Sequence, residues 1–330
     1  MSSTRPRIAV GPSEERAGGA TSGSTPVRES AWSADSTGFA VSAVEAGGGR
    51  VVGLHEPADG LVWVSSRHLD ELQGVLDAST TIRWVQLPFA GVENHVASGL
   101  IDDRHLWTCA KGCYARPVAE HALMLALAGL RMMPTRIRAR SWGREGGTTL
   151  YGAPVTILGG GGITTELLSL MAPFGVEATV VRRDPVPVPG ATRTVATAAL
   201  DDVLAGSLVV FLALALTPQT RRIIDRDRMR AIGPSGWLVN VARGGHVDTD
   251  ALVASLAAGE LGGAALDVTD PEPLPDGHPL WEAPNCMITP HTADTWEMVL
   301  PPLSERIRAN VGRFAAGEQL LGVVDPRAGY

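Results

Sequence analysis

The chain has 330 residues, more than one ordinary hydrophobic core accommodates, and this length predicts two domains. A formal net charge of −7 argues against nucleic acid as a partner, and 45% hydrophobic residues with few aromatics are typical of a soluble α/β enzyme. The longest apolar stretches, 208–216 and 122–130, are too short to cross a bilayer, so no membrane association is expected.

The first part of the chain predicts a small parallel-sheet domain. Residues 11–38, rich in Gly, Ser and Thr, predict a long surface connection. Leucines and valine at helical spacing predict a helix over 68–76. Trp63, Trp84 and Trp107 are expected in the core. Short apolar runs predict strands at 7–10, 50–54, 61–64 and 82–87.

The pattern changes at Pro117, which suits the first turn of a helix. The helix predicted over 118–133 is apolar nearly all round and should be buried. Strands and helices then alternate, as in a doubly wound nucleotide-binding domain. Asp248 or Thr249 is expected to cap a helix ending near Gly259, and a last helix, 296–316, to return to the first domain. The strands are predicted at 155–158, 178–181, 208–212, 237–241, 264–268 and 287–289.

A glycine-rich turn follows the first of these strands and precedes a helix beginning near Ile163. Gly159 permits the tight turn, and Gly161 lets the backbone approach a pyrophosphate at the helix N-terminus, beside Gly162. Thr164 takes the position of the third glycine of this fingerprint, so we expect it to shift the helix slightly. The turn predicts a dinucleotide cofactor.

The cofactor preference is indicated by Arg182 and Arg183 at the end of the next strand. A carboxylate at this point would repel a 2′-phosphate, whereas guanidinium groups bind one. We therefore expect NADP to be preferred over NAD. The alternative is two solvated arginines, with Asp184 reaching a ribose hydroxyl.

Three ionisable residues lie in separate short motifs downstream of the turn. Arg243 is in NVARG, Glu272 in DVTDPEP and His291 in TPHTA. Reduction of a 2-keto acid needs a guanidinium for the substrate carboxylate, an imidazole to move the proton, and a carboxylate to keep that imidazole charged. The ordered set predicts this chemistry.

Residues 82–325 resemble the D-isomer-specific 2-hydroxyacid dehydrogenase family, and within it the glyoxylate and hydroxypyruvate reductases. The resemblance rests on the motifs above and on FAGVEN (89–94), PVAEH (117–121) and LTPQT (216–220). It implies two Rossmann-like parallel-sheet domains with the active site in the cleft between them, and a homodimer joined through the cofactor domains. The flavodoxin-like substrate domain would be 1–116 plus 293–330, and the dinucleotide-binding Rossmann domain 117–292.

The same resemblance implies the roles of the catalytic groups. His291 would be the general acid in reduction, and Glu272 would orient its ring and favour the imidazolium. Arg243 would grip the substrate carboxylate and polarise the carbonyl.

Further contacts are implied for cofactor and substrate. Asp267 would face the nicotinamide carboxamide, and Thr217 would lie at the cofactor. Backbone amides around Ala90 and Gly91 would hold the other side of the substrate carboxylate. For His121, on the buried helix, a packing or interface role is expected.

The sequence therefore predicts a cytoplasmic, NADP-preferring reductase of a small 2-keto acid such as glyoxylate or hydroxypyruvate. A D-2-hydroxyacid oxidiser using NAD is the nearest competitor. A cofactor-sensing binding protein, or corepressor-like scaffold, with little turnover is the alternative from another class. Cys109, Cys113 and Cys286 lack zinc-knuckle spacing, so no metal site and only buried or half-buried thiols are expected.

Overall fold

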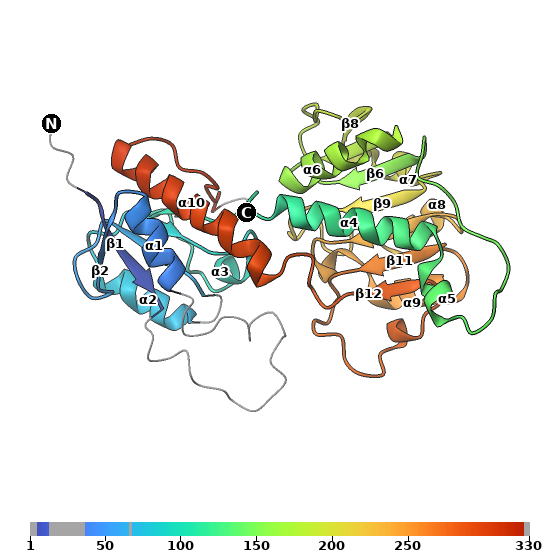
Figure 1. Ribbon diagram of the computed structural model, residues 1–330, viewed down its shortest axis with the longest axis horizontal. Coiled ribbons are helices and arrows are strands. Elements are labelled where there is room, and N and C mark those ends of the chain that lie inside the picture. The colour runs from blue at the N-terminus through green and yellow to red at the C-terminus, as the bar shows by residue number, and fades with distance from the viewer. Residues whose placement is uncertain (1–4, 13–36, 66–67, 327–330) are drawn as a thin grey trace. The chain divides into compact units, whose positions relative to one another are not determined.

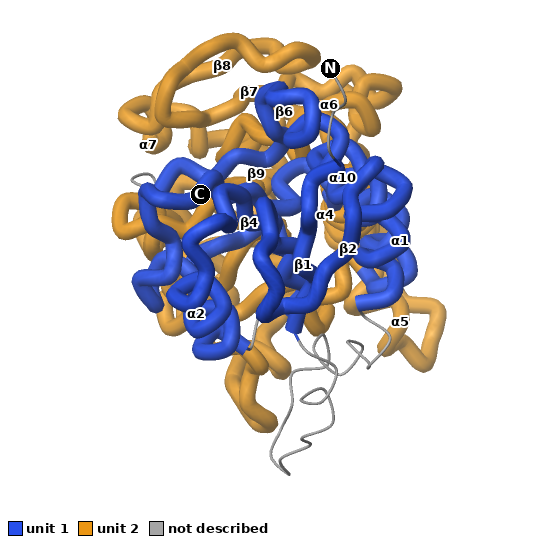
Figure 2. The backbone as a smooth tube through the Cα atoms, turned by 90° about the vertical axis from the view of Figure 1, so that its left-hand side faces the viewer, with its two compact units in different colours: residues 1–114, 295–330 blue, residues 115–294 orange. Residues whose placement is uncertain are grey.

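The computed structural model describes residues 5–12, 37–65 and 68–326. The chain forms two compact units, residues 1–114 with 295–330 and residues 115–294 (Figure 2). Each unit has its own parallel sheet with helices, which confirms the predicted fold class. The connection predicted over 11–38 lies, apart from its ends, outside the described residues.

Unit 1 contains a five-stranded parallel sheet in the order β2-β1-β3-β4-β5, the order of flavodoxin-like domains. Its strands are β1 (Arg7–Gly11), β2 (Arg50–Val52), β3 (Gly60–Trp63), β4 (Trp84–Gln86) and β5 (Leu106–Thr108). Its helices are α1 (Gly38–Ala46), α2 (Leu69–Ala78), α3 (Glu93–Ala97) and α10 (Trp296–Ala316).

The last helix, α10, belongs to unit 1, as the sequence predicted, and packs beside α1 (Figure 1). Asn310 of α10 donates to the side-chain oxygen of Gln86 in β4 at 2.8 Å, and both side chains are fully buried. The predicted core tryptophans, Trp63, Trp84 and Trp107, are at most 1% exposed, which confirms that prediction.

Unit 2 contains a seven-stranded parallel sheet in the order β12-β11-β10-β9-β6-β7-β8. Its strands are β6 (Pro154–Leu158), β7 (Glu177–Arg182), β8 (Arg193–Ala196), β9 (Val209–Leu212), β10 (Trp237–Asn240), β11 (Gly263–Leu266) and β12 (Cys286–Ile288). Its helices are α4 (Ala115–Leu130), α5 (Met133–Arg138), α6 (Gly162–Met171), α7 (Leu200–Leu204), α8 (Arg226–Ile232) and α9 (Thr249–Ala257).

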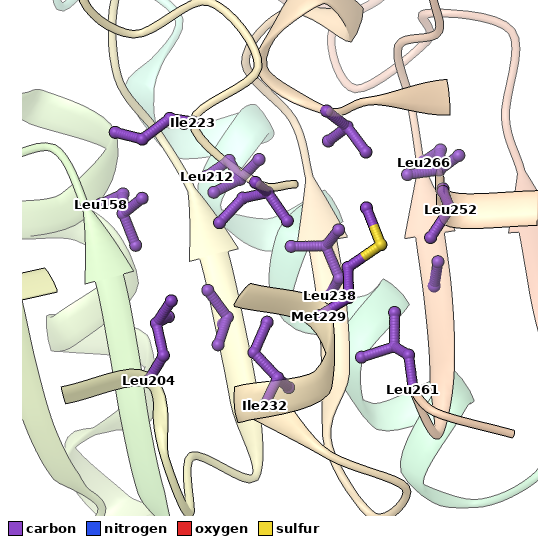
Figure 3. Packing of buried hydrophobic residues seen from close by; sticks show 14 of the residues in the cluster. Leu158, Leu204, Leu212, Ile223, Met229, Ile232, Leu238, Leu252, Leu261 and Leu266 are labelled. Carbon is purple, nitrogen blue, oxygen red and sulfur yellow. The ribbon is translucent and has the colours of Figure 1, made fainter. Parts of the chain in front are cut away.

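Leucines from four neighbouring strands build one core of unit 2 with residues of the helices that cover them (Figure 3). The sequences of the central strands are continuous apolar runs because both faces of a parallel sheet are covered. The labelled strand residues are Leu158, Leu212, Leu238 and Leu266, and the helical ones include Met229, Ile232 and Leu252.

Helix α4 has Pro117 in its first turn, as predicted, but ends at Leu130 instead of 133. The difference arises because Met132 adopts a left-handed conformation, φ 56°, which an α-helix does not tolerate in its interior. Helix α9 begins after Asp248, whose carboxylate accepts from the amide of Ala251 at 3.1 Å, so the predicted cap is confirmed.

Candidate active site

The glycine turn joins β6 to α6 at the point where the strand order of unit 2 reverses, since β6 lies between β7 and β9. Gly159 has φ 106°, and a Cβ added there would lie 2.1 Å from the carbonyl oxygen of Ala213 after β9. The loops after β6 and β9 approach this closely only because residue 159 has no side chain.

The start of α6 offers open space beside backbone amides. Gly161 is the N-cap, and the first amide to bond back to it is that of Thr165, at 3.1 Å to the Gly161 carbonyl. The amides of Gly162 and Ile163 precede that bond in the first turn, where helical N–H groups bind anions. A Cβ on Gly161 would meet nothing within 4 Å. The turn thus fits a pyrophosphate that approaches the backbone closely.

Thr164 is accommodated without the third glycine of the fingerprint. Its side chain is fully buried, and its hydroxyl donates to the carbonyl oxygen of Gly159 at 2.8 Å. The hydroxyl therefore ties the first turn of α6 to the turn that it follows.

Arg182 is the last residue of β7 and Arg183 follows it, so both lie at the end of this strand, as predicted. The aliphatic part of Arg182 lies over Gly160, because a Cβ on that glycine would be 2.9 Å from the Arg182 Cδ. Arg183 is exposed and lies 3.4 Å from the carboxylate of Asp184. One guanidinium is thus placed directly beside the glycine turn and the other on the adjoining surface.

Thr217 lies in a closed turn after β9. Its amide donates to the Thr220 hydroxyl at 2.8 Å, and that hydroxyl donates to the carbonyl oxygen of Ala215, also at 2.8 Å. The Thr220 side chain therefore fixes the loop on which Thr217 lies.

Arg243 follows β10 on a loop fixed by Asn240, which is fully buried. Asn240 donates to the Arg243 carbonyl oxygen at 2.9 Å and accepts from the amide of Ala242 at 3.0 Å. The ring Nδ1 of His246 lies 2.9 Å from the same Arg243 carbonyl oxygen. A Cβ on Gly244 would overlap the carbonyl of Thr269, so the loops after β10 and β11 are in contact.

His291 and Glu272 form a direct pair, with 2.5 Å between Nδ1 and Oε1. Partial burial would raise the pKa of Glu272, but the hydrogen bond and charge of His291, the Thr269 amide and the Arg243 charge lower it below its ordinary value. Glu272 is therefore ionised at neutral pH. The three residues predicted from separate motifs are brought together in unit 2.

Asp267 anchors the segment that carries His291. Its Oδ1 accepts from the Thr289 hydroxyl at 2.6 Å and the Thr292 amide at 2.8 Å, and its Oδ2 accepts from the Ala293 amide at 3.0 Å. Its backbone oxygen accepts from the His291 amide at 2.8 Å. Burial acts to raise the pKa of Asp267, but these bonds and that of His121 lower it. The carboxylate thus holds the turn that presents the imidazole.

His121 belongs to this network, although its sequence indicated only packing or an interface. Its Nε2 lies 3.0 Å from the Thr289 hydroxyl and 3.4 Å from Asp267 Oδ1. The available signal was the position of His121 in the PVAEH motif and of Thr289 immediately before Pro290 and His291. Neither of these motifs alone indicates that His121 and Thr289 are in contact.

Ala90 and Gly91 belong to unit 1, on the loop after β4. Ala90 is exposed and Gly91 partly so.

The three cysteines are free thiols, with Cys109 and Cys286 buried and Cys113 partly buried, as expected. Burial raises the pKa of Cys113 to about 11 and that of Cys286 to about 12. Within residues 5–12, 37–65 and 68–326, no helix combines the length and apolar character needed to span a membrane.

Known proteins resemble both the sequence and the fold. Residues 121–293 match the family described as "D-isomer specific 2-hydroxyacid dehydrogenase, NAD binding domain". An "Uncharacterized protein in proB 3′ region" of Corynebacterium melassecola is 41% identical over 260 residues, covering 77% of this chain and 86% of that protein. A glyoxylate/hydroxypyruvate reductase A of Yersinia enterocolitica is 32% identical over 177 residues, which cover 53% of this chain and only 56% of that enzyme.

Among solved structures, a D-isomer specific 2-hydroxyacid dehydrogenase of Xanthobacter autotrophicus Py2, in complex with NADPH and MES, superimposes with a TM-score of 0.80. It is 27% identical, and the match covers 99% of this chain and 100% of that one. These matches support a nicotinamide-dependent oxidoreductase. The chain belongs to the D-isomer specific 2-hydroxyacid dehydrogenase family.

Proposed function

We propose that the chain reduces a small 2-keto acid, such as glyoxylate or hydroxypyruvate, to its D-2-hydroxy acid with NADPH. The observation that carries this proposal is the 2.5 Å pair of His291 and Glu272, with the Arg243 charge acting on the same carboxylate. An imidazole held by an ionised carboxylate is suited to moving a proton, and a neighbouring guanidinium to binding a carboxylate.

In this mechanism each group of the chain has one role. Because His291 Nδ1 faces Glu272, Nε2 donates the proton to the C2 oxygen of the substrate. Glu272 stabilises the imidazolium before transfer and fixes the ring orientation. Arg243 binds the substrate carboxylate and stabilises negative charge on the carbonyl oxygen. The nicotinamide, when bound, supplies the hydride that C2 receives.

The remaining cofactor and substrate contacts complete the proposal. The amides of Gly162 and Ile163 bind the pyrophosphate, with Gly159 and Gly161 giving it room. In this proposal Asp267 faces the nicotinamide carboxamide and Thr217 lies at the cofactor, as the resemblance implies. In unit 1, the amides of Ala90 and Gly91 bind the substrate carboxylate.

The preference for NADPH rests on Arg182 beside the glycine turn and Arg183 on the adjoining surface. The Xanthobacter relative was solved with NADPH, which is consistent with this choice. Changing Arg182→Ser should raise KM for NADPH by about tenfold and leave that for NADH nearly unchanged, because a charge-assisted phosphate contact is lost.

The deciding experiment follows absorbance at 340 nm with NADPH or NADH and a panel of glyoxylate, hydroxypyruvate, pyruvate and longer 2-keto acids. His291→Ala should abolish turnover, and His55→Ala, which alters an exposed histidine of unit 1, should not. A folded protein that binds NADPH but reduces none of these acids would instead support a cofactor-sensing binding protein or corepressor-like scaffold.

A further inference from the structure

The loop after β4 is held by one short segment of the same unit, Cys109–Tyr114. The Tyr114 hydroxyl donates to the carbonyl oxygen of Pro88, and the amide of Ala110 donates to that of Phe89 at 2.9 Å. The thiol of Cys109 donates to the carbonyl oxygen of Ala90 at 3.6 Å. Three successive carbonyl groups therefore face this segment.

The direction of these carbonyls fixes the direction of the amides. The cis peptide bonds in the described ranges precede Pro12, Pro271 and Pro273, so those of the loop after β4 are trans. In a trans peptide the N–H points opposite to the C=O of the preceding residue. The amides of Phe89, Ala90 and Gly91 therefore all point away from Cys109–Tyr114, toward one side of the loop. Successive amides on one side form an anion-binding arrangement.

The segment is itself fixed in place. Arg306 of α10 donates to the carbonyl oxygens of Cys109 at 2.8 Å and Lys111 at 2.9 Å. The Cys109 amide donates to the carbonyl oxygen of Gly322 at 2.8 Å. Cys109 is fully buried and Tyr114 is 5% exposed. Burial raises the pKa of the Cys109 thiol, so it stays protonated and able to donate.

We propose that Tyr114 and Cys109 are positioning residues for the substrate carboxylate, acting through the carbonyls of Pro88 and Ala90 to aim the amides of Ala90 and Gly91. This inference rests on the proposed function, because it names what sets the affinity of the same carboxylate site. Neither side chain contacts the reacting atoms.

The test compares Tyr114→Phe and Cys109→Ala with the wild type, using the 2-keto acid of highest turnover. Each change removes one neutral hydrogen bond, so KM for the acid should rise by about three- to tenfold. The turnover number kcat should stay within about twofold, because the carboxylate contact is made equally in the ground and transition states. The affinity for NADPH, measured by fluorescence titration, should not change. Cys109→Ser, whose hydroxyl also donates, should restore most of the affinity.

Matched controls separate this effect from a general loss of packing. Tyr151→Phe makes the same chemical change at an exposed tyrosine of unit 2, and Cys113→Ala removes the neighbouring thiol. Both should leave KM unaltered. An unchanged KM in Tyr114→Phe and Cys109→Ala, or an equal fall in kcat with unchanged KM, would overturn the proposal. Thermal unfolding of every variant identifies any that fails to fold. If Cys109→Ala fails to fold, the KM of the milder variant Tyr114→Phe decides the test.

A second measurement keeps this inference distinct from the proposed function. Oxamate, a carboxylate that is not reduced, is titrated calorimetrically into wild type and Tyr114→Phe saturated with NADPH. If the wild type reduces no 2-keto acid, the proposed function fails, yet weaker oxamate binding by Tyr114→Phe would still support the positioning role. Equal oxamate affinity in both proteins, or none in either, would overturn it.

Discussion

Asp267 determines how His291 is presented, although it is not one of the three residues assigned to the reaction. His291 has φ 53°, a left-handed conformation that is uncommon for a residue with a side chain. Such a conformation persists where neighbouring bonds hold it. Here the carboxylate of Asp267 binds the segment on both sides of His291, through Thr289, Thr292 and Ala293.

We therefore expect Asp267→Asn to lower kcat by about ten- to hundredfold, because displacement of a catalytic group by about 1 Å has effects of this size. An amide has only one acceptor atom, so its nitrogen would face one of the backbone N–H groups that the carboxylate now accepts. The measurement is kcat at saturating 2-keto acid and NADPH. Asp270→Asn, at an exposed carboxylate of the adjoining loop, is the control. Equal rates in the two variants would contradict this anchoring role.

His95 is a buried histidine close to the loop that bears Ala90 and Gly91. It is 3% exposed, and neither ring nitrogen has a hydrogen-bond partner among the described residues. Burial lowers its pKa, with a smaller opposing effect of Glu93. The folded state thus binds fewer protons than the unfolded state below the unperturbed pKa of about 6.5.

The consequence is a loss of stability as the pH falls from about 6.5 toward the lowered folded-state pKa of His95, whereas above 6.5 this group contributes no pH dependence. His95→Leu should flatten that part of the profile and raise the midpoint of thermal unfolding at pH 5.5 more than at pH 8. His55→Gln, at an exposed position, should preserve the wild-type slope. A slope that survives in His95→Leu would assign the effect to other groups.

The residues expected to react could be identified from sequence because each lies in a short motif. The residues that hold these reactive groups in place could not be identified in this way. His121 and Thr289 are separated by 168 positions, and only the fold places them within 3.0 Å. The same is true of Tyr114 and Pro88, whose contact depends on how two loops of unit 1 lie together.

At the scale of elements, the central strands of unit 2 and its edge strand β12 were predictable, whereas the opposite edge strand, β8, was not. Strands β9, β10 and β11 are buried throughout, so their sequences are apolar runs. Strand β8 (Arg193–Ala196) is an edge strand of exposed and half-buried residues, and α8 begins Arg-Asp-Arg. Neither has the continuous apolar character on which the prediction depended. The glycine turn, by contrast, was located correctly because its flanking strand and helix were both recognisable.

Two glycines of that turn give opposite predictions for the same substitution. Gly161→Ala places a methyl group in space that no protein atom within 4 Å fills, at an ordinary φ of −93°. The protein should keep its unfolding midpoint but bind NADPH at least about tenfold more weakly, because the methyl group occupies the path of the pyrophosphate. Gly159→Ala would meet the Ala213 carbonyl and should destabilise unit 2 itself. Unfolding curves and fluorescence titrations distinguish the two, and full affinity in Gly161→Ala would place the pyrophosphate elsewhere.

At the scale of the whole molecule, each unit has its own buried core, and one surface segment of unit 2 contributes to neither core. Residues 137–149 are all exposed, and 139–149 contain no helix or strand (Figure 1). Trp142 is 98% exposed and Ile137 70%. Five arginines lie between residues 131 and 144 without an acidic residue, in a chain whose net charge is −7. An apolar and basic arm of this kind is typical of an interaction surface.

The family resemblance implies a homodimer joined through the cofactor domains, and we propose that this arm makes the contact with the second copy, because the acidic remainder of that copy complements its charge. Light scattering should then give about twice the chain mass of 34.6 kDa. Trp142→Ser should raise the dimer dissociation constant by at least about tenfold, because tryptophans buried at an interface contribute strongly to affinity. Trp281→Ser, at a tryptophan that is 41% exposed and bonded to Pro275, is the matched control. Raised salt should weaken the wild-type dimer if the arginines contribute.

A wild-type monomer, or a dimer whose dissociation constant is unchanged by Trp142→Ser, would contradict this role of the arm. If a monomeric Trp142→Ser still reduces the 2-keto acid at the wild-type rate, each chain holds a complete active site.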